Sequence, residues 1–149
     1  MNTKLQMSLL DRLAEGDDSR PTLARIRQSV RRDLECLLNA RRSWLPLEKG
    51  GRELQTSVLG YGLPDFTVMD LGSEEGRQWL CDEVRSTINR FEPRLTRVQV
   101  TMRDAEAPLD RQLRLRIDAV LLVDPVPEPV SFDSEVEPVT LAVTLQECA

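Results

Sequence analysis

The chain of 149 residues contains no histidine. Without imidazole, neither a Ser-His-Asp nor a Cys-His catalytic arrangement can form, and metal sites built on histidine are excluded. Three cysteines are an odd number, and their spacing fits neither a zinc site nor a disulfide framework. We therefore interpret Cys36, Cys81 and Cys148 as reduced thiols of a cytoplasmic protein.

Long apolar runs are also missing. No run approaches the ~20 residues that a membrane span needs, and the first residues lack the pattern of a signal peptide. Aromatic residues make up only 4% of the chain, whereas hydrophobic residues make up 40%. This composition predicts one globular domain over residues 1–149 with a core of Leu, Val and Ile and no direct membrane insertion.

The charge is unevenly distributed around the net value of −5. Residues 20–52 carry nine basic and three acidic side chains, and residues 124–149 carry six acids and no Lys or Arg. Two interpretations are equally open: surfaces that meet different partners, or solvated faces. The acidic balance and the lack of aromatics among the arginines argue against nucleic acid. Arginine is equally suited to the carboxylates of a protein partner.

Two segments repeat apolar residues every three or four positions, which predicts helices. The first spans residues 22–42 and has arginines on much of its remaining surface. The second begins after Ser73, an N-cap candidate, and stops before Pro93, which cannot continue a helix. The glycines and prolines of residues 43–70 predict a folded loop between them, pinned to the core by apolar side chains: Leu59, Tyr61, Leu63 and Phe66.

Beyond Leu95 the pattern alternates. Residues 98–103 and 113–123 are predicted to form an antiparallel pair, and residues 130–133 and 139–145 further strands. Helices first and strands after indicate an α+β fold, with N-terminal helices packed on a small, mainly antiparallel C-terminal β-sheet. We interpret residues 1–20 as a flexible or docking segment, residues 124–129 as an extended connector, and residues 138–149 as a C-terminal strand of open role.

The main candidate functional residues lie at the end of the second predicted helix. Glu92 lies where the helix dipole disfavours a carboxylate, and it is followed by Pro93 and Arg94, so each charge needs a partner. A helix stop with solvated neighbours is an equally fair interpretation of so short a motif. Glu92 with Asp65 or Asp118 could also serve as the carboxylate pair of a glycoside hydrolase. Twenty-five acids produce such pairs by chance, so we expect no catalytic, cofactor or metal site.

Four sequence segments occur in an order that indicates membership of a known protein family. They are SLLDRL at residues 8–13, SVRRDLECLLNAR at 29–41, SVLGYGLPDF at 57–66 and FEPRL at 91–95. This series, which covers about residues 8–135, resembles the TssE subunit of the type VI secretion baseplate. TssE in turn is similar to the lysozyme-like wedge proteins of contractile-tail phage baseplates. Two small departures are Ala40, where Thr is common, and Gly60, where Asn is common.

The resemblance implies a structural role without enzymatic activity in a bacterial, cytoplasmic baseplate. The chain would join the wedge subunits TssF and TssG and form the platform from which the contractile sheath of TssB and TssC polymerises, with other baseplate and tube components as further partners. No cofactor is implied. The alternative is a carboxylate-dependent peptidoglycan hydrolase. The motif residues carried over are Glu92, Pro93 and Arg94, and the loop residues Tyr61, Gly62, Leu63, Pro64 and Asp65.

Three hypotheses about contacts follow. Glu92 and Arg94 either tie the helix end to the loop of residues 60–65 or bind a wedge partner. A second partner face is expected on the first helix, at Arg25, Arg31, Arg32 and Arg41. The sheet offers a template for a partner strand, through an open edge at residues 139–145 or 113–123. The alternative for residues 139–145 is an ordinary internal strand.

Overall fold

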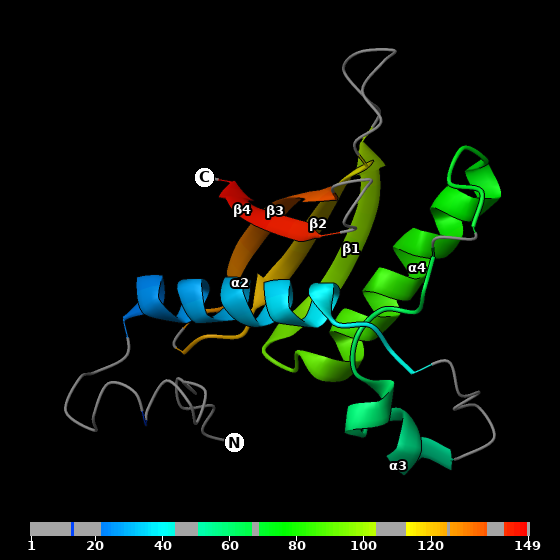
Figure 1. The fold of residues 1–149 in the computed structure, drawn as a ribbon. Helices are drawn as coiled ribbons and strands as arrows, with labels where there is room; N and C mark the ends of the chain where they lie inside the picture. The colour runs from blue at the N-terminus through cyan, green and yellow to red at the C-terminus, as the bar shows by residue number, and fades with distance from the viewer. Residues whose placement is uncertain are drawn as a thin grey trace.

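Two helices lie against one face of a four-stranded sheet in a computed structural model of the chain (Figure 1). The structure describes residue 13 and residues 22–43, 51–66, 69–103, 113–124, 126–136 and 142–148. The helices are α2 (Leu23–Asn39), α3 (Gly51–Gln55), the 3-10 helix η2 (Val58–Gly60) and α4 (Glu74–Phe91). The strands are β1 (Leu95–Arg103), β2 (Leu113–Leu121), β3 (Glu128–Val136) and β4 (Val143–Cys148). The predicted α+β class is confirmed. Most of the segment at residues 8–13 lies outside the described residues.

The long helices begin where capping side chains satisfy their first N–H groups. The Thr22 hydroxyl accepts from the Arg25 N–H at 3.4 Å, and the Ser73 hydroxyl accepts from the Gly76 N–H at 3.1 Å. Helix α4 ends at Phe91, before the proline, as predicted. Helix α2 ends at Asn39, three residues earlier than predicted, because the backbone becomes extended at Ala40.

The strands form one antiparallel sheet in the order β1-β2-β3-β4. The predicted pairing of residues 98–103 with 113–123 is confirmed by β1 and β2. Strand β3 is longer than predicted, because it pairs with β2 from Glu128 onward, inside the expected connector. Since β4 pairs with β3 only from Ser131 onward, Pro129 lies where β3 is an edge strand, a position that tolerates proline.

The helices and the sheet share one core. Leu34 and Leu38 of α2 and Val84 and Ile88 of α4 pack with the side chains that β2 and β3 direct toward the helices. The sheet contributes Leu115, Ile117, Ala119, Leu121, Val130 and Phe132. Each of these Leu, Ile, Val and Phe side chains contributes about 1.5–3 kcal/mol through burial. None of the helices in the described ranges is long and apolar enough to cross a membrane.

Side chains of α2 close the outer edge of β4. The Asn39 amide donates to the Val143 carbonyl at 2.9 Å and accepts from the Val143 N–H at 2.8 Å. The Glu35 carboxylate accepts from the Leu145 N–H at 2.9 Å. An amide that both donates and accepts replaces a neighbouring strand at this point. The predicted strand at residues 139–145 begins at Val143 in the structure, and residues 137–141 lie outside the described ranges.

The hypothesis of an open edge at residues 113–123 is wrong. Strand β2 lies between β1 and β3 and has partners on both sides. The alternation of residues 113–123 predicts a strand with one buried face, but it does not show the strand's place in the sheet. With β2 internal and β4 closed over Val143 and Leu145, β1 is the other edge strand of the sheet.

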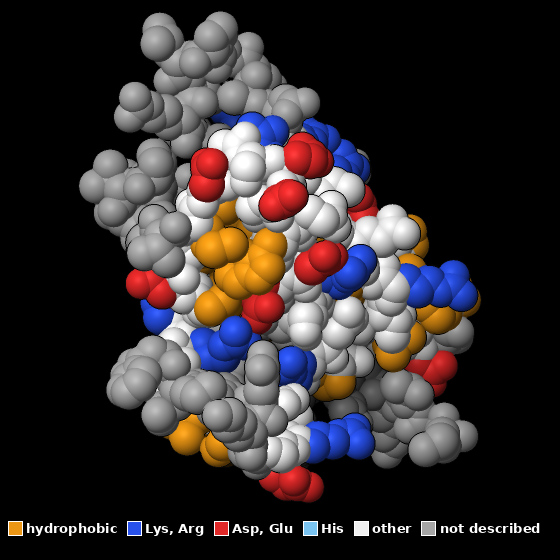
Figure 2. Space-filling view, turned by 90° about the vertical axis from the view of Figure 1, so that its right-hand side faces the viewer, with side chains coloured by type: hydrophobic (Ala, Val, Ile, Leu, Met, Phe, Trp, Pro, Cys, Tyr) orange, Lys and Arg blue, Asp and Glu red, His pale blue; other side chains and the backbone are white. Residues whose placement is uncertain are grey.

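Acidic and basic side chains are mixed on the side of the molecule that α4 faces. Figure 2 shows a small apolar cluster there, bordered mainly by acidic groups, with arginines scattered around it. The described atoms on this side form no continuous basic surface of the kind that binds nucleic acid.

Candidate functional site

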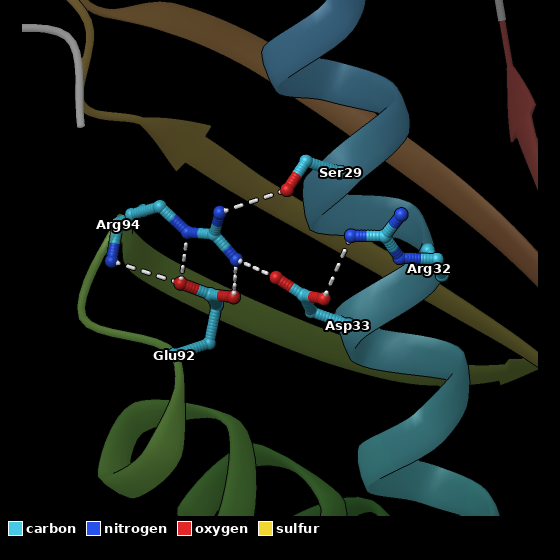
Figure 3. Close-up of polar contacts among 5 residues, drawn as sticks. All are labelled: Ser29, Arg32, Asp33, Glu92 and Arg94. Atoms are coloured by element: carbon cyan, nitrogen blue, oxygen red, sulfur yellow. Dashed lines mark hydrogen bonds and ion pairs between the residues drawn. The ribbon is translucent and has the colours of Figure 1, made fainter. Parts of the chain in front are cut away.

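The site lies where α4 passes into β1. The Glu92 N–H donates to the Ile88 carbonyl at 2.8 Å, and this is the last bond of the helical series. Pro93 has no N–H and cannot extend the helix. The Leu95 N–H then donates to the Glu92 carbonyl at 3.2 Å and closes a tight turn. This turn directs the side chain of Arg94 back toward α2 (Figure 3).

The Arg94 guanidinium joins the end of α4 to the middle of α2. Its Nε donates to Glu92 Oε1 at 2.7 Å, and its Nη2 donates to Glu92 Oε2. Nη2 also donates to Asp33 Oδ2 at 2.6 Å, and Nη1 donates to the Ser29 hydroxyl at 3.3 Å. A planar guanidinium that binds one carboxylate through two nitrogens fixes direction as well as distance. The contacts therefore fix the position of α2 relative to the turn that begins β1.

Burial and opposite charges act together at this junction. The side chains of Glu92 and Arg94 are 6% and 17% exposed. Burial alone would lower the pKa of Arg94, but the hydrogen bonds and charges of Glu92 and Asp33 raise it above its ordinary value. Arg32 Nη2 lies 3.8 Å from Asp33 Oδ1, so two cations face two carboxylates. Glu92 thereby has the partner that its position at the helix C-terminus demands.

The loop motif meets the same helix end through an aromatic contact. The rings of Tyr61 and Phe91 lie 5.3 Å apart at an interplanar angle of 75°, an edge-to-face arrangement. Burial raises the pKa of Tyr61, and the nearby charges of Cys36, Asp33 and Glu92 add to the effect. The end of α4 therefore contacts the loop through the rings of Tyr61 and Phe91, whereas the charged pair of Glu92 and Arg94 contacts α2.

Gly62 lets the loop approach the end of α2. Its φ is +98°, and a Cβ on this residue would lie 2.4 Å from the Ala40 carbonyl oxygen. This close approach allows the Leu63 N–H to donate to Ala40 at 3.0 Å and the Arg42 N–H to donate to Leu63 at 2.8 Å. Only glycine combines that dihedral with that contact.

The other loop residues divide between core and surface. Leu63 and Phe66 are buried, as predicted, Pro64 is half-buried and Asp65 is exposed. Leu59, predicted to pin the loop, is 46% exposed beside Val58 at 89%. The reason is that Gly60 packs its backbone against the Gln55 carbonyl, where a Cβ would lie at 2.2 Å, so η2 turns its side chains outward.

The four arginines of the expected partner face do not share one side. At about 100° per residue, Arg25 and Arg32 lie in line on α2, and Arg31 lies about a quarter turn from Arg32. Arg41 follows the helix end, and its guanidinium carbon lies 5.1 Å from the centroid of the Phe66 ring. The Nε of Arg31 is buried without a hydrogen-bond partner in the described part of the chain. Arg25 and Arg32 remain as a pair that one partner surface can reach.

Of the carboxylate pairs considered for glycoside hydrolysis, Glu92 and Asp118 are not brought together, and Asp65, the other candidate partner, is exposed. Asp118 lies on the sheet face away from the helices, whereas Glu92 lies beside α2. Hydrogen bonds from Ser131 at 2.6 Å and Arg116 at 3.2 Å lower the pKa of Asp118. A glycosidase needs one carboxyl with a raised pKa that keeps its proton, and the lowered pKa of Asp118 does not meet that need. Within the described ranges, no cluster of three Cys, Asp or Glu side chains could hold a metal.

Sequence reasoning missed Ser29 and Asp33 as partners of Arg94. Both lie in α2 four residues apart, so they face the same way. The sequence does point to them, because Ser29 and Asp33 directly precede the buried positions Val30 and Leu34. Polar side chains beside buried positions of a helix are not expected to be fully solvated. The pairing itself joins residues 61 positions apart and needs the fold.

A comparison with protein families identifies the family of the chain. The family "Baseplate wedge protein gp25" matches residues 24–126. The anti-adapter protein IraD of Salmonella arizonae is 33% identical over 104 residues, covering 70% of this chain and 74% of that protein. IraD of Salmonella paratyphi A is 30% identical over 127 residues, covering 85% and 89%. IraD of Escherichia coli O157:H7 is 30% identical over 108 residues, covering 72% of each.

A solved structure shares the fold. A chain of the baseplate complex from the type VI secretion system superposes with a TM-score of 0.53 at 21% identity, covering 76% of this chain and 96% of that chain. The family match spans both helices, the Glu92-Pro93-Arg94 junction and the first two strands. The chain belongs to the baseplate wedge protein gp25 family.

Proposed function

We propose that the chain is a TssE-type wedge subunit of a type VI secretion baseplate. It joins the wedge subunits TssF and TssG and provides the platform from which the sheath of TssB and TssC polymerises. The observation that carries the proposal is the wedge-family match over residues 24–126, with the Glu92-Pro93-Arg94 motif at the joint between helices and sheet. The fold likeness to a baseplate chain is consistent with it.

In this role the junction acts as a rigid corner. Arg94 fixes α2 against the turn that starts β1, so the exposed side of α2 and the edge of the sheet keep one relative orientation. Arg25 and Arg32 then present two guanidinium groups in line toward the carboxylates of a wedge partner. Pre-organised surfaces of this kind lose little conformational entropy on assembly.

The sheath platform would use β1. An incoming strand needs an edge with available N–H and C=O groups. Strand β2 is internal, and Asn39 and Glu35 occupy the edge of β4. The remaining edge strand, β1, is the one to which a sheath strand would add.

A second candidate function rests on the curated relatives, each named an anti-adapter protein, at 33% identity over 70% of the chain for the Salmonella arizonae protein. In that role the same fold would bind an adapter protein. Affinity purification of the tagged full chain from its host separates the candidates. Recovery of TssF and TssG supports the baseplate role, and recovery of an adapter without them supports the second.

The hydrolase alternative has its own test. The full chain is incubated with purified peptidoglycan, and soluble fragments are measured beside a known lysozyme. We expect no release above buffer, because both Glu92 and Asp118 are hydrogen-bonded by arginine. Release that disappears in Glu92→Gln would overturn the structural role of this residue.

A further inference from the structure

A hollow of about 370 Å³ opens at one end of the helix-free face of the sheet. Its floor is a row of cross-strand neighbours, Thr96, Val120 and Pro129, on the side of the sheet opposite the core residues Leu121 and Val130. The remaining lining residues are Arg97, Leu122 and Pro127.

The rim of the hollow is apolar and exposed. Leu122 is 39% exposed, and Val126, which directly precedes Pro127, is 66% exposed. Pro127 and Pro129 fix their own φ angles, so the wall they form is rigid. Leu122, Val126 and the two prolines thus give the hollow an exposed apolar side.

The opposite rim carries a cation in an unusual backbone conformation. The register of β1 against β2 shifts between Thr96 and Gln99, so Arg97 and Val98 together oppose Ala119. This β-bulge gives Arg97 a φ of +53°, the one positive φ of a non-glycine residue in the described ranges. Bulges redirect side chains, and a strained residue is retained where the site uses it.

The guanidinium of Arg97 is exposed and lacks an acidic partner among the described residues. It forms no hydrogen bond or ion pair within the described ranges. By contrast, Arg103, Arg114 and Arg116 on the same face each have an acidic partner within 4.0 Å. A single unpaired cation at the border of an apolar hollow complements a carboxylate that lies next to an apolar group.

We propose that this hollow, defined by Thr96, Arg97, Val120, Leu122, Pro127 and Pro129, binds an extended segment of a protein partner. One apolar side chain of the segment fills the hollow, and a neighbouring Asp or Glu pairs with Arg97. The open shape and six-residue lining suit one inserted side chain better than an enclosed small molecule, which pockets typically bury by about 70–90%. The hollow adjoins the Glu92–Arg94 junction, because the Leu122 N–H donates to the Arg94 carbonyl at 2.8 Å, but its lining residues are distinct from Glu92 and Arg94 and from Arg25 and Arg32.

The test uses the full chain and random peptides of about 12 residues displayed on phage, a length that covers an extended binding segment. Peptides selected on the wild-type chain are expected to carry an apolar residue close to Asp or Glu. For the selected peptides, made synthetically, Arg97→Gln and Leu122→Asp should each weaken binding by at least about tenfold. Arg97→Lys should retain part of the affinity, because it keeps the charge.

The matched control is Val58→Asp, since Val58 is even more exposed but lies in η2. Binding should be unchanged in this variant, and thermal melting should show that all variants are folded. Failure to enrich any peptide, or equal affinity in wild type, Arg97→Gln and Leu122→Asp, would overturn the proposal. Because the selection needs no baseplate protein, its outcome is independent of whether TssF and TssG bind the chain.

Discussion

At the scale of residues, one guanidinium adds a polar connection between α2 and the junction of α4 with β1. Arg94 binds Glu92 two positions before it and Asp33 in α2, so neither carboxylate is solvated freely. Such a buried pair contributes little net stability compared with apolar side chains, but removing one partner leaves an uncompensated charge. Single substitutions should therefore be costly.

Glu92→Gln is expected to lower the free energy of unfolding by about 3 kcal/mol, the lower end of the range for breaking a buried pair, because Asp33 still holds Arg94. Denaturant unfolding of the purified chain measures the change. Glu53→Gln, at an exposed position of α3, is the matched control and should have little effect. An unchanged midpoint for Glu92→Gln, together with lost partner binding, would show that the pair serves an interface and not the fold.

The pKa of Asp118 predicts a pH dependence. It is lowered from the ordinary 3.8, first by the Ser131 hydrogen bond, so the carboxylate stabilises the fold above the unfolded pKa and loses this contribution as pH falls through the folded pKa. The Asp118 side chain is 41% exposed, which limits the effect to below about 1 kcal/mol. As the pH falls through the ordinary pKa of Asp and below it, Asp118→Asn should lose less stability than the wild type in urea titrations. Parallel pH profiles would contradict the assignment.

At the scale of elements, the two edge strands are treated differently. The edge of β4 is covered by side chains of α2, whereas β1 is interrupted by the bulge at Arg97. Both features limit unwanted pairing of the sheet edges with strands of other molecules. In the proposed function, a specific partner strand would add to β1.

Asn39→Ala should uncover the edge of β4. The Val143 N–H and C=O groups then lose their partner, which costs about 1–2 kcal/mol of stability, and the exposed edge should promote self-association at high concentration. Sedimentation velocity over a concentration series measures this. Asn89→Ala, at an exposed position of α4, controls for loss of an amide. A variant that stays monomeric and fully stable would mean that Asn39 does not protect the edge.

At the scale of the whole molecule, local patterns predicted most of the elements but not their neighbours. The Ser73 cap, the stop before Pro93 and the alternation after Leu95 are properties of short segments, and the structure confirms them. Strand order, the covering of β4 by Asn39 and the pairing of Arg94 with Asp33 join residues far apart in sequence. No local pattern contains that information, which is why the predicted edge at residues 113–123 was wrong.

The surface of α2 supplies the prediction for assembly. A double charge reversal, Arg25→Glu with Arg32→Glu, should weaken the complex with the wedge subunits and reduce or reverse its loss of affinity with added salt, because opposite charges become like charges at the contact. Arg52→Glu on α3 changes the same charge at an exposed position away from α2 and should leave the complex intact. Equal salt dependence in all variants would return Arg25 and Arg32 to the role of solvated side chains.

Reconstitution from purified proteins tests the central claim most directly. The full chain is mixed with TssF and TssG from the same genome, and the mass of the product is measured by size-exclusion chromatography with light scattering. We predict one complex that contains all three proteins. If TssF and TssG associate with each other while the chain elutes alone, the chain is not their wedge partner.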